Sequence, residues 1–245
     1  MNKYFIICLV LVSLSLTCVG IVSATGSSPP VSDDMVLFMK FNNDSSVGEN
    51  YGINNIINDY AKQYNASYNL SNYIYNNTGG YLNDGAFKFS PSTGNSIVTN
   101  NNISFNNSQF TINFWIYADK YSSSDRVFTI GNSTQALALC YRTASGGSLV
   151  CQLNNGSLRG AEYYNPTPDN QWSMVSLTYD YLTTNKSIYR NGAFKGTMSI
   201  PNIWSVQSSK LSIGSTSDYT SVLNGTIDDF IIYNKTLSTL DVYNL

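Results

Sequence analysis

The carboxylates are the residues of this chain that could do acid–base chemistry, because the sequence contains no histidine. Without histidine, Ser/His and Cys/His nucleophile systems and histidine-ligated metals are excluded. Glycoside cleavage needs two carboxylates that flank the scissile bond. The chain has only two glutamates, Glu49 and Glu162, which lie far apart in predicted loops. We therefore expect no catalytic residues and no enzyme activity.

Asp228 and Asp229 form an adjacent acidic pair in a strand predicted over residues 226–233. Because side chains alternate along a strand, we expect the two carboxylates to point to opposite faces and to make a poor catalytic dyad. Two roles stay open for Asp228. It is either an acceptor for the amides of a neighbouring loop or a ligand of calcium, which prefers six to eight oxygen ligands.

Aromatic rings are the second group of residues that could bind a ligand. Their faces pack on the C–H groups of sugars, while amides and carboxylates bind the hydroxyl groups. The candidate sugar-binding residues are Trp204, Tyr163 and Tyr219, together with the tyrosines between residues 51 and 81. The alternative is that the 19 tyrosines reflect composition and that most rings cover apolar sheet or stand singly on the surface.

The first residues indicate export. Lys3 precedes an apolar run over residues 5–16, and Val22-Ser23-Ala24 offers a small-residue cleavage site, which predicts a signal peptide over residues 1–24. The run is too short for a membrane span, so we expect no transmembrane segment in the mature protein, although a retained N-terminal anchor is the alternative. A flexible lead, 25–34, and one domain, 35–245, should follow. The predicted location is secreted or on the extracellular cell surface.

The charge of the chain argues against a nucleic-acid partner. The formal net charge is −2, and no basic run is present that could neutralise phosphates. Sequons of the form N-x-[ST] are frequent and predict glycan acceptors in an exported protein, although an Asn- and Ser-rich chain also produces them by chance. They begin at Asn43, Asn65, Asn69, Asn76, Asn102, Asn106, Asn132, Asn155, Asn185, Asn224 and Asn234.

Two of the four cysteines, Cys8 and Cys18, leave with the signal peptide. The other two, Cys140 and Cys151, lie in a predicted hairpin whose turn at residues 144–147 places them opposite each other. Directly opposed residues of an antiparallel pair are close enough for a disulfide when they fall at a non-hydrogen-bonded position. We expect this bond in an oxidising compartment, the alternative being two buried thiols.

Many short strands separated by turns predict an all-β sandwich. In residues 110–118 apolar residues alternate, and the second face carries Trp115 and Tyr117, which is typical of a central strand. Asn191-Gly192 predicts a tight hairpin turn. The strands are expected at 35–41, 87–89, 96–99, 110–118, 126–130, 136–142, 148–153, 172–179, 187–190, 194–198, 210–213 and 226–233.

Two further segments complete the pattern. Ser238 with Asp241 three residues later predicts the capped start of a short C-terminal helix. Residues 42–82 are rich in Asn and Tyr and show little periodicity, which predicts an irregular excursion over the rim of the sandwich.

Six short motifs follow one another from residue 35 to the C-terminus. They are Leu37, Phe38 and Phe41; Gly85-Ala86-Phe87-Lys88-Phe89; Phe110-Thr111 with Trp115-Ile116; Trp172, Val175, Thr178, Tyr179 and Asp180; Tyr189, Asn191 and Gly192; and Gly225, Ile227, Asp228, Asp229, Ile232, Tyr233, Asn234, Leu237 and Ser238. In this order they resemble the laminin G-like, concanavalin A-type jelly-roll family, in the single-domain form that is common in exported microbial proteins and related to pentraxins.

The resemblance implies two antiparallel sheets packed as a jelly-roll sandwich, with a short C-terminal helix and loops at the rim. Members of the family commonly bind carbohydrate or protein partners, and many hold calcium near the rim. Correspondence with the pentraxin pattern places two further candidate calcium ligands at Asn132 and Asp218, in addition to Asp228. The acid-rich cluster that pentraxins carry in this region is reduced here to Asp218. A chain without metal is the alternative.

These observations together predict an exported, non-catalytic binding module. Its partner would be a glycan or a glycosylated surface protein, bound through the rim loops. A structural cell-surface protein that makes protein–protein contacts without a glycan site is the first alternative, and an enzyme with an unusual site is the second.

Overall fold

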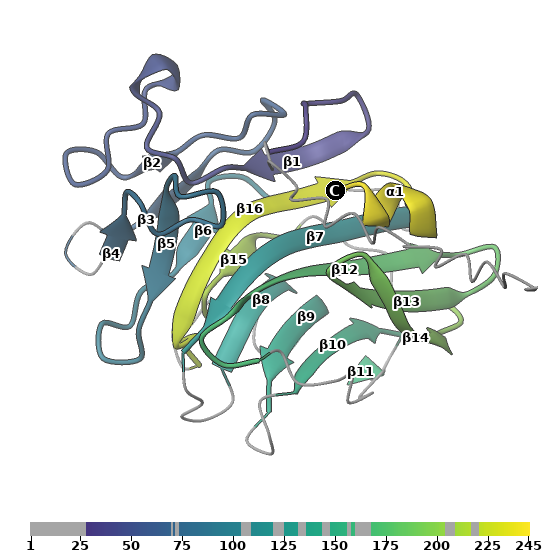
Figure 1. The fold of residues 1–245 in the computed structure, drawn as a ribbon. Helices are drawn as coiled ribbons and strands as arrows, with labels where there is room; N and C mark the ends of the chain where they lie inside the picture. Colours follow the sequence, from purple (N-terminus) through teal and green to yellow (C-terminus); the bar gives the residue numbers. More distant parts are fainter. Residues whose placement is uncertain are drawn as a thin grey trace, which may run out of the picture.

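Two antiparallel sheets face each other as a sandwich (Figure 1). This computed structural model describes residues 28–245 apart from 70, 72–73, 104–108, 120–124, 132–135, 144–147, 156–157, 160–167, 204–208 and 217–220. The predicted all-β jelly-roll sandwich is confirmed. Within the described residues, no helix has the length and apolar character needed to cross a bilayer.

The first sheet carries the candidate site. Its strands are, in spatial order, β14 (Ala193–Ser199), β13 (Asn185–Arg190), β12 (Trp172–Asp180), β7 (Gln109–Ala118), β16 (Gly225–Tyr233), β5 (Ala86–Phe89) and β4 (Ile74–Asn76), and β1 (Met35–Met39) also pairs with β16.

The second sheet lies behind the first in Figure 1. Its strands are β11 (Leu158–Arg159), β10 (Leu149–Asn154), β9 (Ala136–Arg142), β8 (Asp125–Gly131), β15 (Leu211–Ile213), β6 (Ile97–Thr99), β3 (Ala66–Tyr68) and β2 (Ile56–Ile57). A short 3-10 helix, η1 (Ser45–Val47), precedes β2, and the helix α1 (Thr239–Tyr243) ends the chain.

The core fills the space between the sheets. Phe114 of β7 stacks on Phe230 of β16, with ring centroids 5.8 Å apart, and meets the edge of Phe128 from β8 at 5.9 Å. Phe110 and Ile112 are fully buried in the same cluster. The alternation predicted for β7 is therefore confirmed, and β7 is a central strand between β12 and β16.

The disulfide between Cys140 and Cys151 is confirmed. The two residues are directly paired across β9 and β10, with Cα atoms 4.1 Å apart, and both side chains are fully buried. The register of this hairpin is the one that the sequence predicts, because Tyr141 faces Val150.

The expectation of an irregular excursion over residues 42–82 missed β2, β3 and β4. These strands have two or three residues each, too few to show a period in the sequence, and they form by adding to the edges of both sheets. Tyr51 and Tyr68 of this segment pack on Phe87, each with ring centroids 5.0 Å from it. The two-residue strand β11 was also missed.

The helix α1 begins as predicted. The hydroxyl of Ser238 accepts from the backbone N–H of Asp241, whose carboxylate accepts from the N–H of Ser238, which completes a capping box. Val242 of α1 is fully buried in a small cluster with Phe38 and Ile231, on the face of the first sheet that points away from the second. We call this side the outer face.

Candidate functional site

Four aromatic rings gather on the outer face of the first sheet. Antiparallel pairing places Trp172 of β12 opposite Tyr117 of β7, and their ring centroids are 5.7 Å apart. Tyr81, from the turn before β5, stacks on Trp115 with centroids 3.4 Å apart and planes at 12°, and it meets the edge of Trp172 at 6.4 Å. All four rings are half-buried. We call Tyr81, Trp115, Tyr117 and Trp172 the aromatic cluster.

A β-bulge places both aspartates of the acidic pair on this outer face. Asp228 pairs with Trp115 and Ile231 pairs with Asn113. The chain therefore advances three residues along β16 for two residues along β7, which is one extra residue in β16. Asp229 takes the extra position with a φ of 44°. The two residues that flank the pair, Ile227 and Phe230, are both buried between the sheets. The expectation that the carboxylates point to opposite faces was therefore wrong, because strict alternation fails at a bulge.

Asp228 holds the turn that carries Tyr81. Its Oδ2 accepts from the backbone N–H of Tyr81 at 2.9 Å, and its Oδ1 accepts from the backbone N–H of Asp229 at 2.9 Å. A Cβ on Gly80 would lie 2.8 Å from this Oδ2 and 2.4 Å from Oδ1 of Asp84, so the turn has no room for a side chain at residue 80. Asp228 thus acts as an acceptor for loop amides, which in turn positions the Tyr81 ring.

Burial dominates the electrostatics of the pair. Asp228 is 2 % exposed and Asp229 is 5 % exposed. Burial raises the pKa of Asp228 to about 8, and the charge of Asp229 acts in the same direction, against the two backbone N–H donors. Burial also raises the pKa of Asp229 to about 7, against the Ser28 hydroxyl, with the charge of Asp84 adding to the rise and Lys40 opposing it. Near neutral pH these carboxyl groups can therefore both donate and accept hydrogen bonds.

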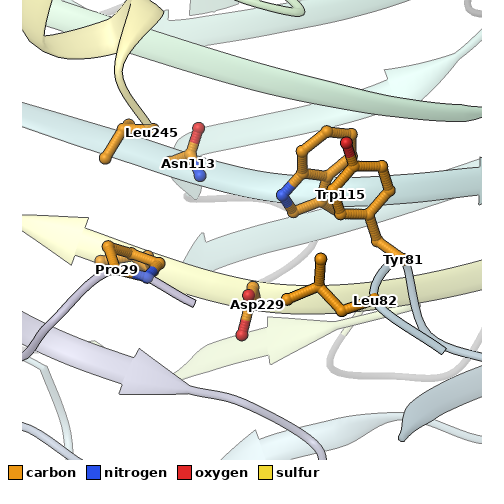
Figure 2. A pocket seen from close by; sticks show the side chains of 8 residues that line it. Pro29, Tyr81, Leu82, Asn113, Trp115, Asp229 and Leu245 are labelled. Carbon is orange, nitrogen blue, oxygen red and sulfur yellow. The ribbon is translucent and has the colours of Figure 1, made fainter. Parts of the chain in front are cut away.

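A small pocket lies beside the Tyr81 ring (Figure 2). Asp229 and Asn113 line it from the sheet, and Pro29 and Leu245 bring the two ends of the described chain to it. The Ser28 hydroxyl donates to Oδ1 of Asp229 at 3.1 Å. We call this space the Tyr81 pocket. Its volume is about 20 Å³, which is room for one water molecule.

A larger depression of about 300 Å³ lies in the segment before β3, lined in part by Asn58, Asp59, Tyr60 and Asn65. Several of its polar groups are engaged within the protein. The Asp59 carboxylate accepts from four backbone N–H groups, and Asn65 accepts from the N–H of Asp59. Asn58 donates to the carbonyl of Val47. Lys62 also lines the depression, and these hydrogen bonds leave fewer of its other polar groups to bind a ligand.

Most of the predicted site residues lie outside the described part of the chain. These are Asn132, Asp218, Trp204, Tyr219 and Tyr163. Their predicted roles in binding calcium or sugar therefore stay predictions.

Calcium also stays a prediction for Asp228. Two loops with oxygen-bearing side chains meet near this residue, because Asn42 donates to Asp84 at 3.1 Å. However, no group of three or more His, Cys, Asp or Glu side chains that could hold a metal ion occurs among the described residues. Glu49 is buried and accepts from the backbone N–H groups of Asp44 and Asn58, while Glu162 lies outside the described residues.

Sequence reasoning included Tyr81 among many candidate tyrosines but missed its partners. The available signal was the second face of β7, where Trp115 and Tyr117 occupy positions that point away from the core. That pattern was interpreted as a mark of a central strand. Aromatic residues on the outward face of a central strand indicate equally well a surface for a ligand.

Comparison with solved structures supports the fold. Domain 4 of AbnA, a GH43 extracellular arabinanase from Geobacillus stearothermophilus solved in complex with arabinotriose, has a TM-score of 0.65 and 14 % identity over 86 % of this chain and 97 % of that domain. The receptor-binding domain of botulinum neurotoxin mosaic serotype C/D has a TM-score of 0.62 and 18 % identity over 86 % of this chain and 50 % of that one.

The binding domain of botulinum neurotoxin DC, solved in complex with rat synaptotagmin II, has a TM-score of 0.63 and 16 % identity over 87 % of this chain and 51 % of that one. This chain therefore corresponds to about half of each toxin domain. No curated protein matches it in sequence. The sequence model of the concanavalin A-like lectin/glucanases superfamily matches residues 91–243, which is more than half of the chain. The chain therefore belongs to the concanavalin A-like lectin/glucanases superfamily.

Proposed function

We propose that this protein is an exported, non-catalytic module that binds glycans, and that the aromatic cluster with the Tyr81 pocket is its binding surface. The observation that carries the proposal is the stacked pair of Tyr81 and Trp115 next to Asn113 and Asp229. Half-buried rings offer flat apolar faces to the C–H groups of a sugar, and the amide and carboxyl groups beside them can bind its hydroxyl groups.

The structure around the rings supports a binding role. The Trp115 and Trp172 rings stand on paired strands in the middle of the sheet, so the backbone holds them in a defined arrangement. Tyr81 is held by the hydrogen bond from its backbone to Asp228. A surface prepared in this way loses little conformational entropy when a ligand binds. The arabinotriose complex of the arabinanase domain supports carbohydrate as the ligand class by analogy of fold.

The acidic pair supports binding rather than catalysis. Glycosidases place two carboxyl groups on either side of the scissile bond. Both oxygens of Asp228 already accept backbone N–H groups, so Asp229 is the member of the pair that can face a ligand. Release of reducing ends from a polysaccharide panel, if reproducible and lost in an Asp229→Asn variant, would refute the non-catalytic part of the proposal.

The direct test measures binding of oligosaccharides to the full chain by calorimetry after a glycan array has selected them. We expect Tyr81→Ala to weaken binding by at least about fivefold, because one stacked aromatic contact contributes about 1 kcal/mol or more in a desolvated site. Tyr243→Ala is the matched control, since Tyr243 is an exposed ring on α1 outside the pocket. Equal losses in the two variants, or a blank array, would refute the proposal.

A protein–protein contact is the second candidate function. Phe194 on the edge strand β14 is 52 % exposed, and Leu240 and Tyr243 on the adjacent helix α1 are 67 % and 70 % exposed. Exposed apolar side chains on neighbouring elements are typical of contact surfaces. A blank glycan array together with a partner whose binding is lost on Phe194→Ser would favour this alternative.

A further inference from the structure

The N-terminal strap, residues 28–34, closes one side of the Tyr81 pocket. Its far end is fixed to the sheet, because the N–H of Asn234 donates to the carbonyl of Asp34 at 2.8 Å and Lys235 forms an ion pair with Asp34. Its near end reaches Asp229 through the Ser28 hydroxyl at 3.1 Å, and Pro29 lines the pocket. In Figure 2 the Pro29 ring lies across the pocket from the Tyr81 ring.

The strap places sugar-like groups at the edge of the pocket and on its Asp229 carboxyl group. The Ser28 hydroxyl is an alcohol that donates to a carboxyl oxygen, as a sugar hydroxyl does. The Pro29 ring presents aliphatic C–H groups and has no backbone N–H to donate. Because the remaining volume is about 20 Å³, a sugar residue can enter only where these groups leave.

The buried acidic surroundings of the pocket select against an acidic ligand. The carboxyl groups of Asp84, Asp228 and Asp229 lie close enough to interact electrostatically. Asp229 and Asp84 both raise the pKa of Asp228, and Asp84 also raises the pKa of Asp229. Lys40 is a cation that acts on both Asp229 and Asp84. Burial already disfavours the ionised form of the carboxyl groups at this site. A carboxylate on the ligand would meet the same penalty, and any charge on Asp84, Asp228 or Asp229 would add to it.

We propose, building on the glycan-binding function above, that the Tyr81 pocket takes a neutral sugar residue, one hydroxyl of which replaces the Ser28 hydroxyl as the donor to Asp229. Glycans built of neutral sugars should bind, and those that must place a uronic or sialic acid in the pocket should not. The aromatic cluster then holds the next residues of the same glycan.

The displacement of Ser28 is tested with Ser28→Ala. Loss of one competing hydrogen bond should strengthen binding of a neutral oligosaccharide, such as arabinotriose, lactose or cellotriose, by about threefold to tenfold. Ser32→Ala is the control, because Ser32 is an exposed serine of the same strap that does not line the pocket. Unchanged or weaker binding in Ser28→Ala would overturn the displacement.

The ligand class is tested by pairing neutral with acidic probes. Lactose should bind at least tenfold more tightly than sialyllactose, and cellotriose at least tenfold more tightly than trigalacturonate. Asp229→Asn should reduce this preference, whereas Asp33→Asn, which removes the same charge from an exposed position of the strap, should leave it unchanged. Equal affinity for neutral and acidic probes would overturn the inference while leaving glycan binding intact. Absence of binding to every probe, or binding that is insensitive to Tyr81→Ala, would overturn the proposed function and the inference with it.

Discussion

The buried pair Asp228 and Asp229 should make the stability of this protein fall as the pH rises. In the unfolded chain an aspartate titrates near its ordinary pKa of 3.8, whereas in the folded protein burial raises the pKa of Asp229 to about 7 and that of Asp228 to about 8. Between these limits the folded state binds more protons than the unfolded state. The free energy of unfolding then decreases with pH, so the stabilising contribution is complete below pH 4 and is lost as the pH passes 7 to 8.

The magnitude follows from the two pKa values. Each carboxyl that is protonated only in the folded state contributes a slope of up to about 1.4 kcal/mol per pH unit. For Asp229 the interval from 3.8 to about 7 corresponds to an upper bound of about 4 kcal/mol. Asp229→Asn removes this cost of burying a charge, and it also removes the negative charge that raises the pKa of Asp228.

The assay is urea unfolding of the wild type and Asp229→Asn at pH 5, 6, 7 and 8.5. We expect Asp229→Asn to gain stability over the wild type as the pH rises, by about 1 to 3 kcal/mol between the lowest and highest pH. Asp33→Asn is the control because this aspartate is exposed, and it should run parallel to the wild type. A pH-independent difference between Asp229→Asn and the wild type would refute the electrostatic account of the pair.

Three further predictions concern the hairpin, the helix and calcium. Replacing Cys140 and Cys151 together by serine should lower the free energy of unfolding by about 3 kcal/mol in chemical denaturation, as the chain-entropy model gives for a separation of 11 residues; no loss under non-reducing conditions would contradict it. Ser238→Ala should cost about 1 kcal/mol, because alanine lacks the hydroxyl that accepts from the backbone N–H of Asp241, and an unchanged melting temperature would contradict it. Calcium at 100 times its Kd should stabilise the protein by about 2.7 kcal/mol, which corresponds to a rise of about 5 to 10 °C in Tm, and Asp218→Ala should abolish the rise. If the ion leaves the Tm of the wild type unchanged, the predicted calcium site is wrong.

The turn that carries Tyr81 is closely packed around Gly80. Gly80 has no space for a methyl group, since a Cβ would lie 2.6 Å from the carbonyl oxygen of Gly85 as well as close to two carboxylates. The turn and the bulge of β16 therefore depend on each other. Residues 80–84 are linked to the C-terminal motif only in three dimensions, through the hydrogen bond from the backbone N–H of Tyr81 to Asp228.

Local patterns were sufficient wherever one strand or one hairpin decides the outcome. The alternation in β7 reports which residues face the core, because a strand buries every second side chain. The spacing of Cys140 and Cys151 reports the disulfide, because a hairpin pairs residues symmetrically about its turn. The capping box of α1 spans four residues and is likewise readable from the chain alone.

The candidate site needed the tertiary structure, because its parts come from distant segments. The extra residue at Asp229 is invisible in the sequence: a bulge is defined by the register of β16 against β7, and that register depends on burying Ile227 and Phe230 together. The stack of Tyr81 on Trp115 likewise exists only after the turn has docked on the sheet. Sequence alone determined a β-sandwich and its hairpin disulfide, through short-range periodicity. Long-range pairing decided which polar and aromatic side chains share the outer face.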